Sequence, residues 1–390
     1  MTRSNKTVFH GILDGEPAER LLWIPDLTWW RDAQMIQGVL PSEYHGDEGF
    51  LQLHRDLGVM PYYIYALERS GKPSKGFSVH QIGGENQPYN GVWGLSYDGV
   101  DVEQRRSGEV TDTLFHLDGS QLVQSKRYLP DSYCHAFLEY PVKSPKDFGT
   151  LQKIIERYRF CSTEQDFGYL AALWGDEGVP IAPLPRSPLS ALIVDWLGIV
   201  NLTFAWHDDP VPICKLLQSI DEVNEEGFRI ITGSEARIFH FCDNLSAANY
   251  GSFFDQLAAG YYCKRVNQLH AAGQRCVVHL DGTIVGLLDR LAACGMDGIE
   301  AITPKPVGTV AAKDLRALAR NNCVVLWGGL PSAIFVPSFP RDQFETYLQE
   351  LIAIAKVDKR MIIGSADQIS PDAEMDRVRR VSEVIRRDDQ

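Results

Sequence analysis

Short hydrophobic runs alternate along most of the chain with segments whose hydrophobic positions recur at helical spacing. These runs predict β-strands at residues 21–24, 57–65, 180–182, 236–242, 275–278, 298–302, 324–327 and 361–363. Eight strands with intervening helices are typical of an α/β fold built as a single (β/α)₈ TIM-type barrel. An open doubly wound sheet is the alternative, but the sequence contains no glycine-rich phosphate fingerprint. We therefore predict the barrel.

The pattern changes between residues 92 and 140, where hydrophobic and polar residues alternate as in antiparallel strands. Residues 111–116 and 122–128 flank a turn at Asp118, Gly119 and Ser120, which predicts a β-hairpin. Ser144 and Pro145 then predict the start of a helix that runs to about residue 160. Because no flexible linker interrupts the chain, we predict one domain over residues 1–390 with an antiparallel insert at about 92–140.

Polar residues follow several of the predicted strands at the point where each strand ends. Parallel strands place their carboxyl ends at one edge, where barrel enzymes keep their reacting groups. We therefore expect the polar ends to converge on one site. The residues concerned are Asp26, Asp243, His279, Asp281, Glu300 and Asp367.

Composition and charge narrow the class of protein. The 390 residues are 44% hydrophobic and carry a formal net charge of −13, which argues against nucleic-acid binding. Eight cysteines occur without a CxxC pair, which favours reduced thiols over disulfides. No hydrophobic run approaches the roughly 18 residues of a membrane helix. We expect a cytoplasmic protein that binds a small molecule and neither nucleic acid nor membrane.

The order of the motifs in the C-terminal half resembles that of the uroporphyrinogen decarboxylase (URO-D) superfamily. This superfamily also contains zinc-dependent methyltransferases that pass methyl groups between corrinoid proteins and thiols. The resemblance implies a (β/α)₈ barrel with an N-terminal β-hairpin insertion, a pocket at the strand carboxyl ends, a role in one-carbon metabolism and a homodimer. The motifs lie at residues 243–244, 277–282, 295–300, 326–329 and 363–367.

The chain also departs from this family pattern. The decarboxylases have an N-terminal segment with arginines that meet a highly acidic substrate, and here only Arg31 remains, followed by Asp32. In the thiol methyltransferases, the strand that ends in the residue matching His279 carries His-x-Cys, and a second cysteine follows the last strand. Asp281 and the stretch around Asp367 occupy those two places in this chain.

A metal site is the first interpretation of these residues. His279, Asp281 and Glu300 supply one imidazole and two carboxylates, which suit a divalent metal and leave positions open to substrate. Zinc is the expected metal. The alternative is that the three side chains hydrogen-bond an organic substrate directly. Asp243, His279 and Asp26 are the predicted catalytic residues; the alternative is an N-cap for Asp243 and a turn for Asp26.

Five aromatic residues and Asp367 complete the predicted site as substrate-binding groups. The aromatic residues could form the walls of a pocket for a hydrophobic or cationic substrate, and ordinary packing is the alternative for each one. Asp367 would bind the substrate, or cap a helix. The aromatic residues are Trp29, Trp30, Tyr62, Trp93 and Trp327.

Three functions remain open at this point. The leading hypothesis is a metal-assisted methyltransferase or demethylase that acts on a small methylated or thiol compound. Because the sequence shows no corrinoid-binding domain, cobalamin would then arrive on a partner protein. The second hypothesis is a cofactor-free decarboxylase, a lyase, in which Asp26, Asp243 and His279 hold the substrate. The third is a small-molecule binder without catalysis.

Overall fold

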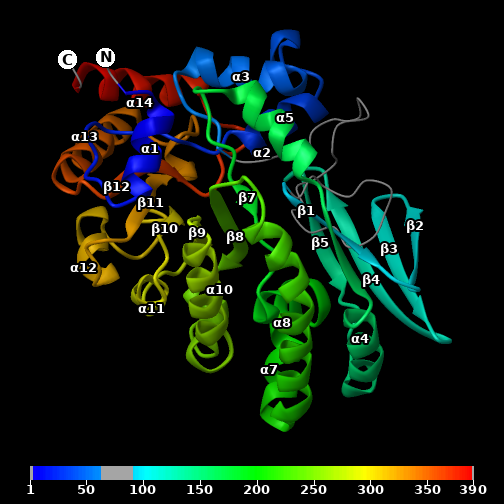
Figure 1. Cartoon of the computed structure of the whole chain (residues 1–390). Coiled ribbons are helices and arrows are strands. Elements are labelled where there is room, and N and C mark those ends of the chain that lie inside the picture. The colour runs from blue at the N-terminus through cyan, green and yellow to red at the C-terminus, as the bar shows by residue number, and fades with distance from the viewer. Residues whose placement is uncertain (1–2, 63–90, 389–390) are drawn as a thin grey trace.

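A six-stranded parallel sheet forms the centre of the computed structural model, which describes residues 3–62 and 91–388. Its strands are adjacent in chain order, and helices α10 to α13 lie along its outer side (Figure 1). Six of the predicted strands are confirmed, with ends that differ by a few residues. They are β7 (Ala182–Pro183), β8 (Ile238–Leu245), β9 (Arg275–Leu280), β10 (Gly298–Ile302), β11 (Val325–Pro331) and β12 (Met361–Ala366).

Two extended segments continue the sheet beyond its edge strands. At the β12 edge, Trp23 forms a parallel bridge with Ile363. At the β7 edge, the backbone N–H of Ile181 donates to the carbonyl oxygen of Tyr62 at 3.0 Å. These segments correspond to the first two predicted strands, and residues 63–65 of the second lie outside the described residues. The six-stranded sheet thus continues through a parallel bridge at one edge and a backbone hydrogen bond at the other.

One hydrophobic cluster draws on alternate residues of these segments. Residues two apart in a strand face the same side, so the cluster marks a common interior. Its members from the strands and extended segments are Leu22, Ile24, Met60, Tyr62, Val179, Ile181, Ile238, Val277, Val325, Trp327 and Ile362. Helix α1 adds Val8, Phe9, Ile12 and Leu13. A Cβ on Gly298, the first residue of β10, would lie 3.6 Å from Leu13, so α1 covers the end where the strands begin.

The remaining helices surround these segments. Local signals explain several ends: α3 stops at Gly58, which has a φ of +69°, and the Asp209 side chain caps α8 by accepting from the N–H of Val211. No single described helix is long and hydrophobic enough to cross a membrane. The helical segments Pro188–Trp196 and Gly198–Asp208 reach the required length and hydrophobicity only when counted together, and a bend of 120° separates them. The α-helices are α1 (Asn5–Leu13), α2 (Thr28–Ile36), α3 (Gly46–Leu57), α4 (Phe148–Ile155), α5 (Glu164–Trp174), α6 (Pro188–Ser190), α7 (Gly198–Asp208), α8 (Pro210–Thr232), α9 (Ala247–Tyr250), α10 (Ala259–Ala271), α11 (Leu288–Ala293), α12 (Leu315–Ala319), α13 (Arg341–Val357) and α14 (Met375–Asp388). Short 3₁₀ turns are η1 (Ser42–Tyr44), η2 (Pro145–Asp147), η5 (Ala312–Asp314) and η6 (Ser332–Ile334), and η3 (Ala191–Trp196) and η4 (Phe254–Ala258) are π-helical.

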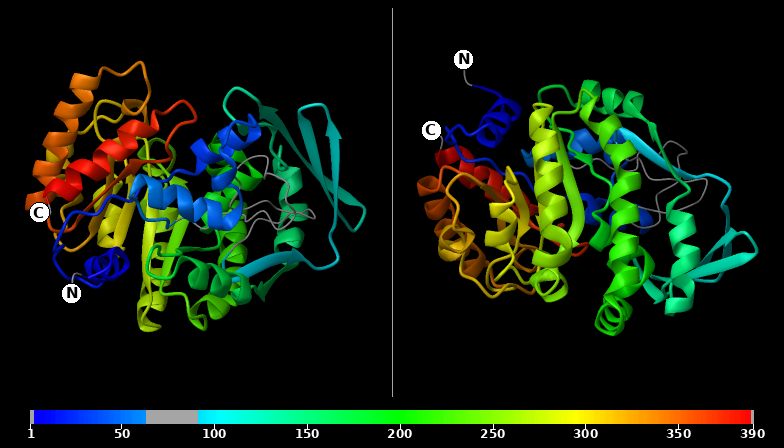
Figure 2. Two further views of the ribbon diagram at one scale, coloured as in Figure 1. Left: turned by 90° about the horizontal axis from the view of Figure 1, so that it is seen from above. Right: turned by 60° about the horizontal axis from the view of Figure 1, so that its bottom comes forward.

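The predicted antiparallel insert is present and lies to one side of the parallel sheet (Figures 1 and 2). The hairpin turn is confirmed: Asp118 and Gly119 have φ values of +51° and +77°, as a two-residue hairpin turn requires. The four strands are β2 (Asp101–Ser107), β3 (Val110–Leu117), β4 (Ser120–Leu129) and β5 (Cys134–Glu139).

The helix predicted from Ser144 to about residue 160 is shorter than expected. Ser144 and Asp147 form the capping box of its first turn, but α4 ends at Ile155. Residues Tyr158–Ser162 form strand β6, which pairs with β1 (Trp93–Tyr97) in a separate antiparallel sheet. Tyr158 and Phe160 are both buried, which is the two-residue alternation of a strand. Pairing with a distant strand therefore decides the structure of this segment.

Candidate metal site

Two histidines and a glutamate on three neighbouring strands bring their polar atoms together. Nδ1 of His279 lies 2.9 Å from Oε2 of Glu300, and Nε2 of His240 lies 3.4 Å from the same oxygen. One ligand atom from each residue lies within 4.8 Å of the other two. All three side chains are buried, with relative exposures of 2% to 8%. Two imidazoles and one carboxylate are donors that zinc and ferrous iron both accept.

The strand register explains this convergence. Glu300 on β10 lies directly opposite His279 on β9. His240 on β8 pairs with Val277, two residues before His279 on the same face of the strand. The β10–β11 register then shifts at a bulge that includes Ala301, whose φ of +64° is rare for a residue other than glycine. Such backbone strain is common beside functional groups.

Two of the three candidate ligands have a polar neighbour on the side away from the cluster centre. Sγ of Cys242 lies 3.2 Å from Nδ1 of His240. The hydroxyl of Tyr62 donates to Oε1 of Glu300 at 2.9 Å. Partners of this kind orient metal ligands in proteins. The arrangement thus holds Nε2 of His240 and Oε2 of Glu300 toward the centre of the cluster.

The electrostatics of the cluster keep charge on all three residues. Burial would raise the pKa of Glu300, but His279 and His240 outweigh it and lower that pKa to about 2. Burial would lower both histidine pKa values, but Cys242 and Glu300 raise the pKa of His240 to about 9. Glu300 and Asp367 likewise raise the pKa of His279 to about 10. Without a metal, the buried carboxylate therefore lies between two imidazolium ions.

Asp281, the third ligand predicted from sequence, does not belong to this set. It follows the last residue of β9, and its N–H donates to the carbonyl oxygen of Leu245. Gly282, with a φ of +58°, turns the chain immediately afterwards. His279 and Glu300 come together as predicted, but among the described residues His240 takes the place predicted for Asp281. The charge of Asp281 still contributes to the raised pKa of His279.

His240 and Cys242 are not among the site residues predicted from the sequence. Both lie in a predicted strand, at the spacing His-x-Cys, and two-residue spacing in a strand puts both side chains on one face. Ile238, two residues earlier, belongs to the interior cluster. This alternation is the sequence signal that points to His240, which lies inside the strand rather than at its end.

Asp26 lies beside the end of β12, where it forms a parallel bridge with Gln368. Its carboxylate is buried and accepts a hydrogen bond from the N–H of Thr28 at 2.9 Å. Burial, reinforced by the charges of Glu300 and Asp367 and opposed by Thr28, raises the pKa of Asp26 to about 7. A carboxyl with this pKa can accept or donate a proton near neutral pH. Its catalytic role stays a prediction.

Asp243 lies on the other face of β8. The ring of Tyr262 on α10 packs 5.2 Å from that of Phe241, two residues before Asp243, and its hydroxyl reaches the Asp243 carboxylate, so both residues face α10. The carboxylate of Asp243 accepts from the hydroxyl of Tyr262 at 2.7 Å and from the N–H of Ser187, the N-cap of α6, at 3.2 Å. These contacts tie β8 to two helices. The catalytic role predicted for Asp243 finds no support in this placement.

Two of the predicted aromatic residues lie in the interior beside the cluster. The rings of Tyr62 and Trp327 are 4.4 Å apart. Gly364 makes room for Trp327, because a Cβ at that position would lie 2.6 Å from the indole ring. Asp367 lies at the end of β12, with Oδ1 3.8 Å from Nε2 of His279.

The other three tryptophans have packing roles in the structure. Trp93 is buried in the main core, and its indole N–H donates to the carbonyl oxygen of Pro183. Trp29 donates to the carbonyl oxygen of Ser132 in the insert, and Trp30 packs against a second hydrophobic cluster. Substrate binding by any of the five aromatic residues stays a prediction.

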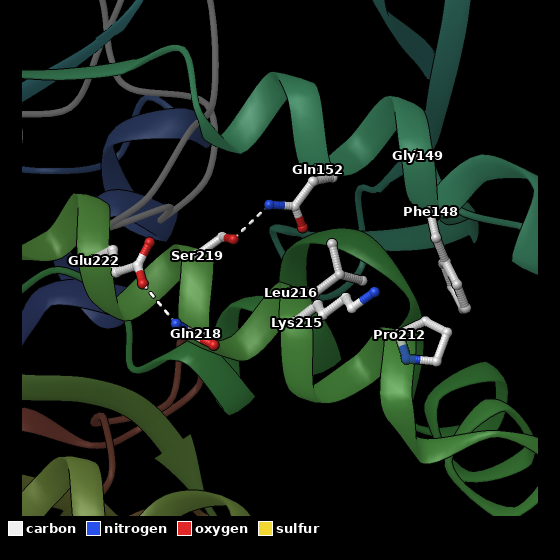
Figure 3. A pocket seen from close by; sticks show the side chains of 9 residues that line it. All are labelled: Phe148, Gly149, Gln152, Pro212, Lys215, Leu216, Gln218, Ser219 and Glu222. Atoms are coloured by element: carbon white, nitrogen blue, oxygen red, sulfur yellow. Dashed lines mark hydrogen bonds between the residues drawn. The ribbon is translucent and has the colours of Figure 1, made fainter.

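A groove of about 430 Å³ lies between α4 and α8 (Figure 3). It contains no residue of the histidine–glutamate cluster, and β9 to β12 do not line it. Gln152 on α4 donates a hydrogen bond to Ser219 on α8, and Gln218 donates one to Glu222 within α8. The groove is lined by Phe148, Gly149, Gln152, Pro212, Lys215, Leu216, Gln218, Ser219 and Glu222.

Comparison with solved structures finds the same fold in a methyltransferase from Methanosarcina mazei. The two chains are 13% identical, the match covers 99% of each, and the TM-score is 0.60. At this identity the likeness establishes the fold alone. No protein-family model and no curated protein matches the sequence.

Proposed function

We propose that this protein is a metal-assisted methyltransferase or demethylase of the URO-D superfamily that acts on a small methylated or thiol substrate. The observation that carries the proposal is the buried cluster of His240, His279 and Glu300. Three protein ligands leave coordination positions open, which is how catalytic zinc sites differ from structural ones. Zinc is the metal we expect. The fold shared with a methyltransferase supports the reaction class.

We also propose that the parallel segments close into a (β/α)₈ barrel. The order of the six strands, extended by one segment at each edge, is the order of such a barrel. The interior cluster receives alternate residues from both edge segments, Leu22 and Ile24 from one and Met60 and Tyr62 from the other. The two edges therefore share one interior, as closure requires. In such a barrel, His279 lies next to the end of β9, Glu300 lies in the middle of β10, and His240 lies near the start of β8.

The residues suit a transfer of a methyl group to or from sulfur. A bound divalent metal would act as a Lewis acid and favour the thiolate form of a substrate thiol. His240, His279 and Glu300 would hold the metal, and Asp26 could accept the thiol proton. The reaction forms a sulfur–methyl bond, and the donor keeps the electron pair of the bond that breaks. Tyr62 would keep Glu300 in place through its hydrogen bond.

The alternative functions gain less support. A decarboxylase with an acidic substrate needs cations in its pocket, but the groups that shift the pKa values of Asp26, His279 and Glu300 are histidines, carboxylates and Thr28 rather than arginines. A binder without catalysis would not need a carboxyl with a pKa near 7. A corrinoid protein as methyl donor, a homodimeric assembly and a cytoplasmic location stay proposals.

A direct test incubates the zinc-loaded protein with methylcobalamin and a panel of small thiols. The readouts are loss of methylcobalamin absorbance and mass-spectrometric detection of the methylated thiol. We expect turnover by the wild type and loss of turnover in Glu300→Gln. Glu222→Gln, the same change in the groove between α4 and α8, should remain active. Turnover that survives Glu300→Gln, or no methylation of any thiol in the panel by the zinc-loaded protein, would contradict the proposal.

A further inference from the structure

Cys242 places a sulfur atom beside His240, one of the candidate metal ligands. It lies two residues after His240 on the same face of β8, and its side chain is buried. Sγ is 3.2 Å from Nδ1 of His240, whereas Nε2 of the same ring faces Glu300 at 3.4 Å. The two nitrogens of one imidazole thus face two different partners.

The sulfur lies outside the inner set of donors. The two nitrogens of an imidazole point away from each other, so an ion bound at Nε2 would lie across the ring from Sγ. Consistently, the group of atoms within 4.8 Å of one another contains donors of His240, His279 and Glu300 but none of Cys242. The inner set therefore has two nitrogens and one oxygen, without sulfur.

The two contacts of the thiol are compatible with a His240 ring that carries its proton on Nδ1. Sγ donates to the carbonyl oxygen of His240 at 3.7 Å. A metal bound at Nε2 leaves the ring proton on Nδ1, and Nδ1 can then donate to Sγ while the S–H points to the carbonyl oxygen. Neutral imidazole has one N–H, and the lone pair then belongs to Nε2. That nitrogen is the one that faces Glu300.

We propose that Cys242 is a positioning residue that fixes the Nδ1–H tautomer and the ring orientation of His240, so that Nε2 is presented to the metal. This inference rests on the proposed metal site and adds to it that the thiol is not a ligand. Carboxylates and carbonyl oxygens usually fill this role beside metal-binding histidines. A thiol is a weaker acceptor, but its N–H partner here is buried.

Cobalt(II) provides the first test, because a sulfur ligand gives cobalt an intense near-ultraviolet charge-transfer band. We expect no such band in the cobalt-loaded wild type. Cys242→Ala should weaken zinc binding by about 10- to 100-fold, the usual effect of losing an outer partner. Cys242→Ser keeps a donor and an acceptor and should restore affinity to within a few-fold of the wild type. Cys294→Ala, which removes a buried thiol at the end of α11 and belongs to no candidate group of metal ligands, is the matched control and should leave affinity unchanged.

The tautomer itself can be observed by ¹⁵N–¹H spectroscopy of the zinc-loaded protein labelled at histidine. We expect His240 to carry its proton on Nδ1 in the wild type and in Cys242→Ser. A charge-transfer band that disappears in Cys242→Ala would make the thiol a ligand, overturning this inference while the metal site stands. Unchanged affinity and tautomer in Cys242→Ala would also overturn it. If the wild type binds neither zinc nor cobalt, the proposed function fails as well.

Discussion

Zinc binding to the metal-free protein should release about two protons at pH 7. The pKa values of His240 and His279, about 9 and about 10, leave both rings charged at that pH, and only neutral imidazole binds a metal. Glu300, with a pKa of about 2, is already ionised and releases none. Two histidines with ordinary pKa values would release only about 0.5 proton in total. Zinc affinity should therefore rise about 100-fold per pH unit up to about pH 9.

Calorimetric titration in two buffers with different ionisation enthalpies measures the protons released. Glu300→Gln provides the comparison, because the carboxylate is one of the groups that hold both histidine pKa values high. In this variant the histidine pKa values, followed by NMR without metal, should fall to about 6.5 or below, since burial then dominates. Release of less than one proton by the wild type, or unchanged histidine pKa values in the variant, would refute the electrostatic account.

Three further outcomes are expected. The raised pKa values of His240 and His279 contribute stability that is complete below about pH 6.5 and is lost as the pH rises through 9 and 10; thermal unfolding of the metal-free protein should show this decline, and a flat profile would contradict it. Gly364→Ala should destabilise by about 1–3 kcal/mol through its clash with the indole ring, whereas Gly149→Ala, with open space around it, should not, as paired denaturant titrations would show. Asp243→Asn should lower the free energy of unfolding and leave zinc affinity unchanged. A folded variant that no longer binds zinc would show that Asp243 belongs to the metal site.

The sequence predicted most of the central sheet, because its strands are short hydrophobic runs with clear ends. The insert hairpin was equally accessible, since the turn at Asp118 and Gly119 has a distinct local signal. Strand β6 (Tyr158–Ser162) was missed because its structure depends on pairing with β1, about 60 residues earlier in the chain. Local patterns cannot report such a partner.

Only part of the candidate site could be predicted from the sequence, because the site also depends on contacts between distant segments. His279 and Glu300 were identified from strand ends, and the structure places them together. His240 lies inside a strand, where a buried histidine looks like a core residue until its neighbours across the sheet are known. Asp281 and Asp243 were placed in the site from their nearness in sequence to strand ends. Asp281 lies just past the end of β9 and supplies no atom to the group of candidate ligands, and the Asp243 carboxylate accepts a hydrogen bond from Tyr262.

The metal content of protein purified without a metal-binding tag tests the central claim most directly. Plasma mass spectrometry would compare the wild type with His240→Ala and Asp281→Ala. We predict nearly one zinc per chain in the wild type and in Asp281→Ala, and a loss in His240→Ala. No metal in the wild type, or metal that is lost with Asp281 and kept without His240, would contradict the site described by the structure.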